Sequence, residues 1–104
     1  GDHPWFKREG NDLLLDLPVT VGEAYHGAKI QVPTPEGPVG VRVPKGVRGG
    51  ARLRLRGKGV KHGAEVGDVI VQIHVVVPTN AEAEAMVDAL EATYSEPVRG
   101  DLSF

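Results

Sequence analysis

The sequence contains no cysteine, and aromatic residues make up only 5% of its 104 positions. The lack of cysteine excludes disulfide bonds, thiol catalysis and zinc sites with cysteine ligands. No apolar run approaches the ~20 residues that a transmembrane helix needs, and no secretory signal is visible at the start. We therefore expect a cytoplasmic protein without a membrane partner. Because the chain opens without Met, we also expect it to be a fragment of a longer protein.

Charge is nearly balanced overall but is unevenly placed along the chain. The net charge is −2 and the pI is about 6.1, so the chain as a whole is not suited to binding polyanions. The segment from Arg42 to Lys61 nevertheless holds eight basic residues and no acidic one, whereas Glu82 to Asp101 holds six acidic residues and one arginine. Such asymmetry can steer association with partners.

Alternation of apolar and polar residues predicts that most of the chain forms β-strands. In the segment DLLLDLPVTV, every second residue from Leu13 to Val19 falls on one face. The longest β-branched run precedes Pro78, which should end a central strand. Paired glycines and the segment TPEGP supply the turns. The predicted strands cover residues 12–21, 28–33, 39–44, 51–56 and 66–78.

Two segments have helical character. Residues 20–27 predict about one turn, and residues 79–94 predict a longer helix that begins with a Thr79–Glu82 capping box and ends before Pro97. The expected fold is therefore mainly β: a small antiparallel β-sandwich with a short helical turn and one C-terminal α-helix. The expected units are a lead-in from a preceding domain (1–8), a β-sandwich (9–78), a helix (79–95) and a tail (96–104).

The basic segment RLRLRGKGV, residues 52–60, allows several interpretations. In a strand, the arginines share one solvated face and the leucines enter the core, which needs no ligand. Nucleic-acid binding is the rival, but all five aromatic residues lie outside the segment, where a single-strand binder would interleave them. Contact with an acidic peptide is a third alternative. A Walker phosphate loop fails on spacing, because no Ser or Thr follows Gly57-Lys58.

No catalytic or metal motif is found. The four histidines, His3, His26, His62 and His74, match no metal-ligand spacing, and no serine lies in a nucleophile-elbow context. His74 is expected on a strand face, and the pairs Asp12/Asp16 and Glu82/Glu84 on the solvated surface. The tripeptide 99–101, Arg-Gly-Asp, is interpreted as a chance match to a cell-adhesion motif. We expect no enzyme activity, no cofactor and no metal.

Taken together, the motifs resemble a known family. They are HPWFKREGNDL (3–13), LPV (17–19), VPT (32–34), RLRGKG (54–59) and GD (67–68). This pattern is similar to the C-terminal domain of DnaJ-type J-domain co-chaperones, and more to the second of their two tandem β-domains than to the first. The resemblance implies a module that binds unfolded or partly folded polypeptides and delivers them to a DnaK-type ATP-dependent chaperone. His3-Pro4-Trp5 is not the His-Pro-Asp triplet of a J-domain.

The resemblance also implies where clients bind. A peptide can add to an exposed strand edge, where main-chain hydrogen bonds give affinity that tolerates many sequences. Carried over by position from the first tandem domain, the apolar contacts are Ile30 and Val32, with Val71 and Ile73 on the other side. The alternative is that all four residues belong to the core.

The C-terminal helix suggests a homodimer. An isolated helix of about 16 residues is marginal in water, so its apolar stripe must be buried, either on its own sheet or against a second copy. In the resembling family, the C-terminal helix mediates homodimerisation. The stripe consists of Ala83, Met86, Val87, Leu90 and Tyr94. The competing functions are therefore a client-binding chaperone module, a nucleic-acid-binding β-domain that uses Arg42–Lys61, and a purely structural dimerisation module.

Overall fold

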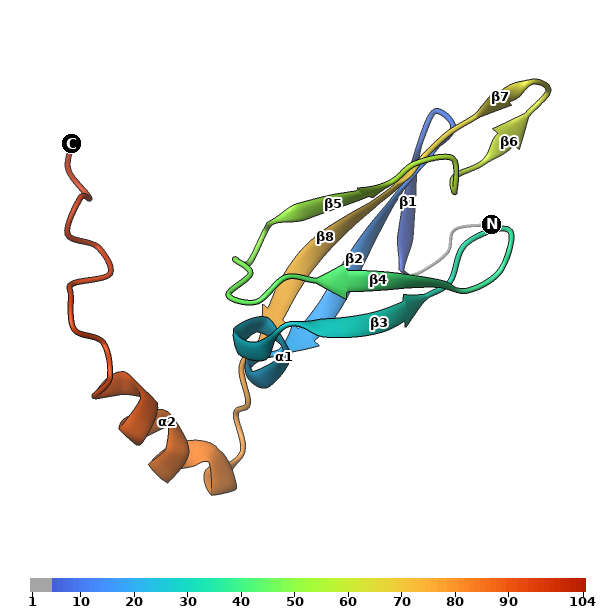
Figure 1. Ribbon diagram of the computed structural model, residues 1–104. Coiled ribbons are helices and arrows are strands. Elements are labelled where there is room, and N and C mark those ends of the chain that lie inside the picture. Colours follow the sequence, from blue (N-terminus) through green and yellow to red (C-terminus); the bar gives the residue numbers. More distant parts are fainter. Residues whose placement is uncertain (1–4) are drawn as a thin grey trace.

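The largest sheet of the protein has four strands and follows from the predicted apolar alternation. The computed structural model describes residues 5–104, and Figure 1 shows the arrangement of its elements. The strand order is β1-β2-β8-β5. These strands are β1 (Phe6–Glu9), β2 (Asp12–Thr20), β8 (Val69–Val76) and β5 (Arg52–Leu55).

A two-stranded hairpin forms the second layer of the sandwich. Strands β3 (Ala28–Val32) and β4 (Val39–Val43) pair antiparallel and lie over one face of the four-stranded sheet (Figure 1). Helix α1 (Val21–His26) lies at one end of the sandwich. A small hairpin of β6 (Lys61–His62) and β7 (Glu65–Val66) projects from the other end.

The core lies between the two layers and is built from alternate residues of the strands. From Leu15 to Thr20 in β2 and from Val69 to His74 in β8 every second side chain is buried, while the intervening side chains are exposed or half-buried. This is the pattern expected for a sheet with one face covered. The buried core residues are Leu15, Leu17, Val19, Ala24, Val32, Val41, Val43, Val69, Val71 and Ile73.

The fold class is confirmed as mainly β with one C-terminal helix, and most strand pairs are antiparallel as predicted. Strands β2 and β8 are the exception, because they pair in parallel over their length. A two-residue period assigns side chains to faces but says nothing about strand direction. A parallel pair needs a long crossover, which here is the whole segment between Thr20 and Val69.

The first described residues do more than lead into the domain. Residues 6–9, partly inside the expected lead-in, form β1, which pairs antiparallel with β2 at the edge of the sheet. The turn between these strands uses Gly10 at a φ of 63°, a conformation that glycine adopts without steric cost. His3 and Pro4 lie outside the described residues.

The short helix α1 is confirmed and has a complete capping box. The Glu23 backbone N–H donates to Thr20 Oγ1 at 3.0 Å, and the Thr20 backbone N–H donates to Glu23 Oε1 at 2.9 Å. Both bonds satisfy backbone donors that a helix start leaves free. The helix therefore begins sharply at the end of β2, and its Ala24 enters the core.

The C-terminal helix is shorter than predicted and has a different cap. A 3-10 turn, η1 (Ala81–Ala83), continues into α2 (Glu84–Glu91). The Thr79 capping box is wrong: Asn80 caps the turn, since its Oδ1 accepts from the Ala83 N–H at 3.1 Å. Asparagine is at least as good a cap as threonine. None of the helices in residues 5–104 has both the length and the apolar content needed to span a lipid bilayer.

Candidate functional site

The arginines of the basic segment lie on the outer face of a strand. In β5 the leucines are half-buried toward the core and the arginines are exposed. Arg54 pairs with Asp68 at 2.6 Å, and Arg52 Nε donates to Gln72 Oε1 at 3.2 Å. These contacts support the first interpretation, in which the arginines occupy the solvated face of a strand.

The glycines after β5 form a tight backbone junction. The Gly59 N–H donates to the Gly67 carbonyl at 2.9 Å, and the Gly67 N–H donates to the Val60 carbonyl at 3.0 Å. The Val60 N–H in turn donates to the Asn11 carbonyl at 2.9 Å. The junction therefore ties the β1–β2 turn to the segments before β6 and β8. The junction offers no phosphate-binding loop, because these backbone N–H groups already donate to carbonyl oxygens within the chain.

Asp68 holds this junction to β5 through its carboxylate. Its Oδ1 accepts from the Gly57 N–H at 2.8 Å and its Oδ2 pairs with Arg54. The Gly57 hydrogen bond, followed by Arg54, lowers the pKa of Asp68 below its ordinary value. The Asp68 N–H donates to Asp12 Oδ1 at 2.7 Å, so Asp12 has a structural role rather than the simple solvated one we expected.

We expect the Asp68→Asn variant to be less stable than the wild type at neutral pH. A carboxylate whose pKa is lowered by folding stabilises the fold above its ordinary pKa of about 3.9, and this contribution is lost as pH falls through the folded value. Urea unfolding at about pH 7 should therefore give a lower midpoint for the variant. The difference should shrink toward about pH 3. Asp16→Asn, at an exposed carboxylate, is the control. If the urea midpoints of the wild type and Asp68→Asn differ equally at both pH values, this stabilising role of the Asp68 carboxylate is contradicted.

The three histidines within the described residues do not assemble into a site. His74 is exposed on a strand face, as predicted, with Nδ1 3.6 Å from Asp16 Oδ2. His26 makes an edge-on ring contact with Tyr25 at 4.9 Å between centroids, and His62 is exposed on β6. His3 lies outside the described residues. Residues 5–104 contain no group of three or more histidine or acidic side chains placed to hold a metal ion.

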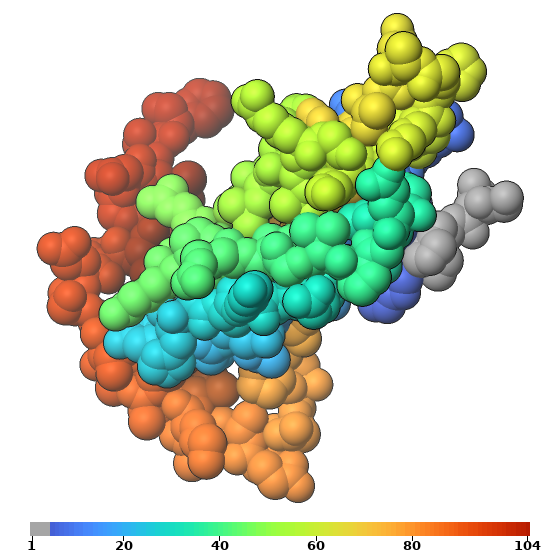
Figure 2. Space-filling view, turned by 45° about the vertical axis from the view of Figure 1, so that its right-hand side comes forward, coloured from blue at the N-terminus to red at the C-terminus, as the bar shows by residue number. Residues whose placement is uncertain are grey.

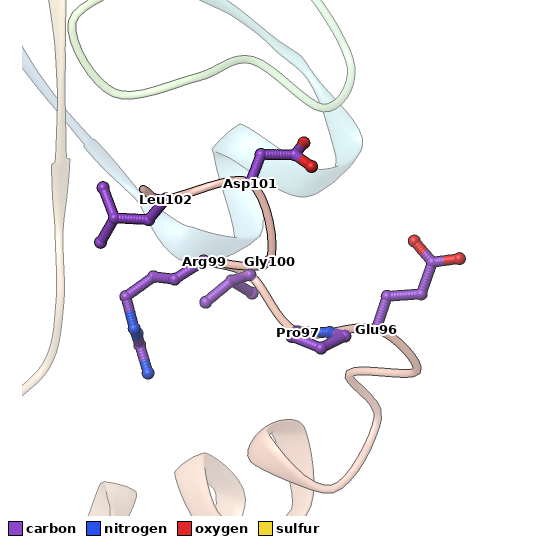
Figure 3. A pocket seen from close by; sticks show the side chains of 7 residues that line it. Glu96, Pro97, Arg99, Gly100, Asp101 and Leu102 are labelled. Carbon is purple, nitrogen blue, oxygen red and sulfur yellow. The ribbon is translucent and has the colours of Figure 1, made fainter. Parts of the chain in front are cut away.

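One hollow lies in the C-terminal tail and is built by a single segment. It measures about 570 Å³ and is lined only by residues 96–102. Figure 3 shows that the side chains of Arg99 and Asp101, within the Arg-Gly-Asp tripeptide, point in different directions. The turn is held by a bond from the Gly100 N–H to the Pro97 carbonyl at 3.2 Å. The hollow therefore lacks the convergent polar groups typical of an active site.

Most of the predicted client-contact residues are core residues. Val32, Val71 and Ile73 are essentially fully buried, and only Ile30 is half-buried. These three side chains point into the sandwich by the same alternation that predicts the strands. Their assignment as surface contacts is therefore corrected in favour of the core alternative. Client binding itself stays a prediction.

An apolar groove that the sequence did not reveal lies between β2 and β3. Two adjoining hollows, of about 230 and 270 Å³, share Pro33 in their linings. Trp5, which is 54% exposed, lines the first, and Phe6 and Leu13 line the second. Among residues 5–104, β3 pairs only with β4, and Gln31, Val32 and Pro33 at the end of β3 line the first hollow. The sequence feature that could have indicated this groove is Trp5, the single tryptophan of a chain with few aromatic residues.

A second apolar groove, of about 510 Å³, lies between α2 and the β-sandwich. The predicted helix stripe lines one wall, with Met86 75% exposed and Leu90 44% exposed. Val75 and Val77, at the end of β8 and just after it, line the facing wall. The helix extends away from the sandwich in Figure 1. The complete set of stripe residues in the lining is Ala83, Met86, Val87, Leu90 and Tyr94.

Comparisons with known proteins agree with the motif pattern. The family model described as the DnaJ C terminal domain matches residues 1–78. A Chaperone protein DnaJ from Roseiflexus sp. (strain RS-1) is 49% identical over 80 residues, which is 75% of this chain and 22% of that protein. Chaperone protein DnaJ 2 from Mycolicibacterium paratuberculosis is 47% identical over 91 residues, 86% of this chain and 23% of that protein. The chain thus spans less than a quarter of the length of these relatives.

Proposed function

Because the chain belongs to the DnaJ C-terminal domain family, we propose that it is a non-enzymatic chaperone module that binds unfolded polypeptides. The single observation that carries this proposal is the apolar groove beside the unpaired edge of β3. An extended client can pair with such an edge through its main chain, and its side chains can enter the adjoining hollows. Recognition of this kind tolerates many client sequences.

Client contact in this proposal falls on Trp5 and Pro33, which line the groove. Ile30 packs against the core and does not line it. A bound apolar side chain in the groove would cover the exposed part of the Trp5 ring. Burial of apolar area favours binding by about 25 cal/mol per Å². The conformational entropy that each client residue loses on becoming ordered opposes binding. We therefore expect weak, rapidly reversible binding, which suits a protein that must release its clients.

The same proposal places the module in a sequence of chaperone events. Within a longer protein, clients held here would be passed to a DnaK-type ATP-dependent chaperone. Dimerisation through the C-terminal helix would place two grooves on one assembly. Two linked weak sites hold one long unfolded chain more strongly than either site alone, because the second contact is intramolecular.

We expect Trp5→Ala to reduce client binding several-fold without unfolding the domain. The first test measures how well the isolated chain suppresses the aggregation of a chemically denatured protein. The second test follows the tryptophan fluorescence of the wild-type chain as an unfolded polypeptide without tryptophan is added. The wild-type emission should shift to shorter wavelength as the Trp5 ring is covered.

Tyr25→Ala is the matched control, because Tyr25 is an exposed aromatic residue on α1, outside the groove. Equal suppression by the wild type and Trp5→Ala would move client binding away from this groove. No suppression by the wild-type chain would instead favour a purely structural dimerisation module.

A further inference from the structure

The second hollow of the apolar groove has one wall on each layer of the sandwich. It measures about 270 Å³. Phe6 and Leu13 form the wall on the four-stranded sheet, and Pro33, Thr34 and Pro35 form the wall on the connection between β3 and β4. The size of the side chain that fits between these walls therefore depends on how the β3–β4 turn is held against the sheet.

The turn that carries the second wall is a rigid unit. The Thr34 N–H donates to the Gly37 carbonyl at 3.1 Å, and the Gly37 N–H donates to the Thr34 carbonyl at 2.9 Å. The Thr34 hydroxyl donates to the same Gly37 carbonyl at 2.6 Å. Pro33 and Pro35 have φ fixed by their rings, on either side of Thr34. A contact that holds Glu36, within the turn, therefore holds the whole wall.

The wall on the four-stranded sheet is fixed by the backbone junction that follows β5. The Leu13 N–H donates to the Asp68 carbonyl at 2.9 Å, and the Val60 N–H donates to the Asn11 carbonyl at 2.9 Å. Lys61 directly follows Val60 and begins β6. The backbone of Lys61 is thus anchored to the same junction that positions Leu13.

An ion pair connects the turn to this junction. Lys61 Nζ contacts Glu36 Oε1, and this contact lowers the pKa of the Glu36 carboxyl, mainly through its hydrogen bond and then through its charge. Figure 2 shows the turn of the β3–β4 hairpin, coloured teal, against the yellow-green segment that leads into β6. Among residues 5–104, no other ion pair involves residues 28–43. We call the Glu36–Lys61 ion pair the turn clasp.

We propose that Glu36 and Lys61 are positioning residues of the client groove, and that the turn clasp sets which client side chains the 270 Å³ hollow accepts. This inference rests on the client function proposed above. The clasp joins the turn wall to the junction that already holds the sheet wall. Neither residue of the clasp lines the hollow, so both act on clients through the turn. When the clasp is broken, the turn wall can move, and the hollow discriminates less between side chains of different size.

The test compares two short fluorescently labelled peptides, one that alternates serine with leucine and one that alternates serine with alanine. Each is titrated with the 104-residue chain and followed by fluorescence anisotropy. The wild type should prefer the leucine peptide about tenfold, as a fitted apolar site does. Lys61→Glu places two carboxylates together, so this preference should fall to about threefold or less.

Two further variants separate the clasp from a general change of charge. The double variant Glu36→Lys/Lys61→Glu restores opposite charges and should recover about half of the lost preference. Recovery is incomplete because Lys58 also acts on position 36. Lys45→Glu is the matched control: it makes the same charge change at an exposed position in the loop after β4, and it should leave the preference within about twofold of the wild type.

Hydrogen exchange tests the clasp without any peptide. The Gly37 N–H, which bonds within the turn, should exchange faster in Lys61→Glu than in the wild type and more slowly again in the double variant, because exchange reports local opening. Equal exchange in all three chains would show that the ion pair does not hold the turn.

The peptide results separate failure of the clasp from failure of the groove. An unchanged leucine preference in Lys61→Glu, or a double variant that behaves like the single one, would overturn the positioning role. Equal loss in Lys45→Glu would assign the effect to overall charge. Wild-type binding that Trp5→Ala weakens and Lys61→Glu leaves unchanged removes the clasp alone. If the wild type binds neither peptide, the client groove and the inference that rests on it fall together.

Discussion

Replacing Leu90 with Asp should dissociate the dimer that we propose for this chain, weakening association about 100-fold or more. Leu90 lies in the middle of the α2 stripe and is 44% exposed in the single chain. Burying a leucine at an interface contributes about 1.5–3 kcal/mol. An unpaired carboxylate in the same place adds a desolvation cost. Each 1.4 kcal/mol changes a dissociation constant tenfold, so the two effects together give the expected loss.

The geometry of α2 supports the proposal that a second copy of the chain is its partner. The groove between α2 and the sandwich has apolar walls on both sides, and the helix of another copy can fill it while its own groove is filled in return. Such reciprocal contact is the usual form of a two-fold dimer. An exposed apolar surface of this kind on a monomer indicates an interaction site.

Sedimentation velocity over a range of protein concentrations measures the effect. Ala85→Asp is the matched control, because it adds the same charge to α2 outside the groove lining and should leave association nearly unchanged. If Leu90→Asp sediments as the wild type does, α2 is not the dimer interface, and the avidity argument for two client grooves fails with it.

The fold was largely predictable because local patterns of apolar and polar residues indicate most of its strands and helices. Alternation located β2, β3, β4, β5 and β8, and the three- and four-residue spacing located α2. Apolar alternation does not determine the direction of a strand, so the parallel pairing of β2 with β8 was not predicted. The cap of the last helix was also misassigned, because Thr79 and Asn80 are both good caps and only the backbone geometry selects between them.

The functional surfaces were less predictable because they depend on packing between layers. Positional transfer placed client contacts on Val32, Val71 and Ile73, although the same alternation that predicts the strands turns these side chains inward. The groove at Trp5 is lined by residues of both layers, so it depends on how the β3–β4 hairpin packs against the sheet. Likewise, the ion pair between Arg54 and Asp68 joins a residue of β5 to one in the segment just before β8, which spacing along the chain does not reveal.

Gly67→Ala should destabilise the domain by about 3 kcal/mol or more, although it adds a single methyl group. A Cβ at Gly67 would lie 1.8 Å from the Asn11 carbonyl oxygen and 2.8 Å from the Asp12 nitrogen. Overpacking commonly costs about 1–3 kcal/mol when side chains can move aside. Here the obstructing atoms are backbone atoms held in the glycine junction by hydrogen bonds, so the cost should reach the upper end or exceed it.

Two other glycines separate crowding from backbone strain in this experiment. Gly22→Ala lies in α1, where the nearest atom is Thr20 Oγ1 at 3.8 Å, so it should be neutral or stabilising by about 0.4–1 kcal/mol. Gly63→Ala has open space but a φ of 63°, and should cost about 1–2 kcal/mol. Thermal and urea unfolding of the three variants should rank Gly67→Ala as the least stable. If Gly67→Ala unfolds like Gly22→Ala, the junction is loose, and the glycines and Asp68 of the family motif do not hold the sheet together.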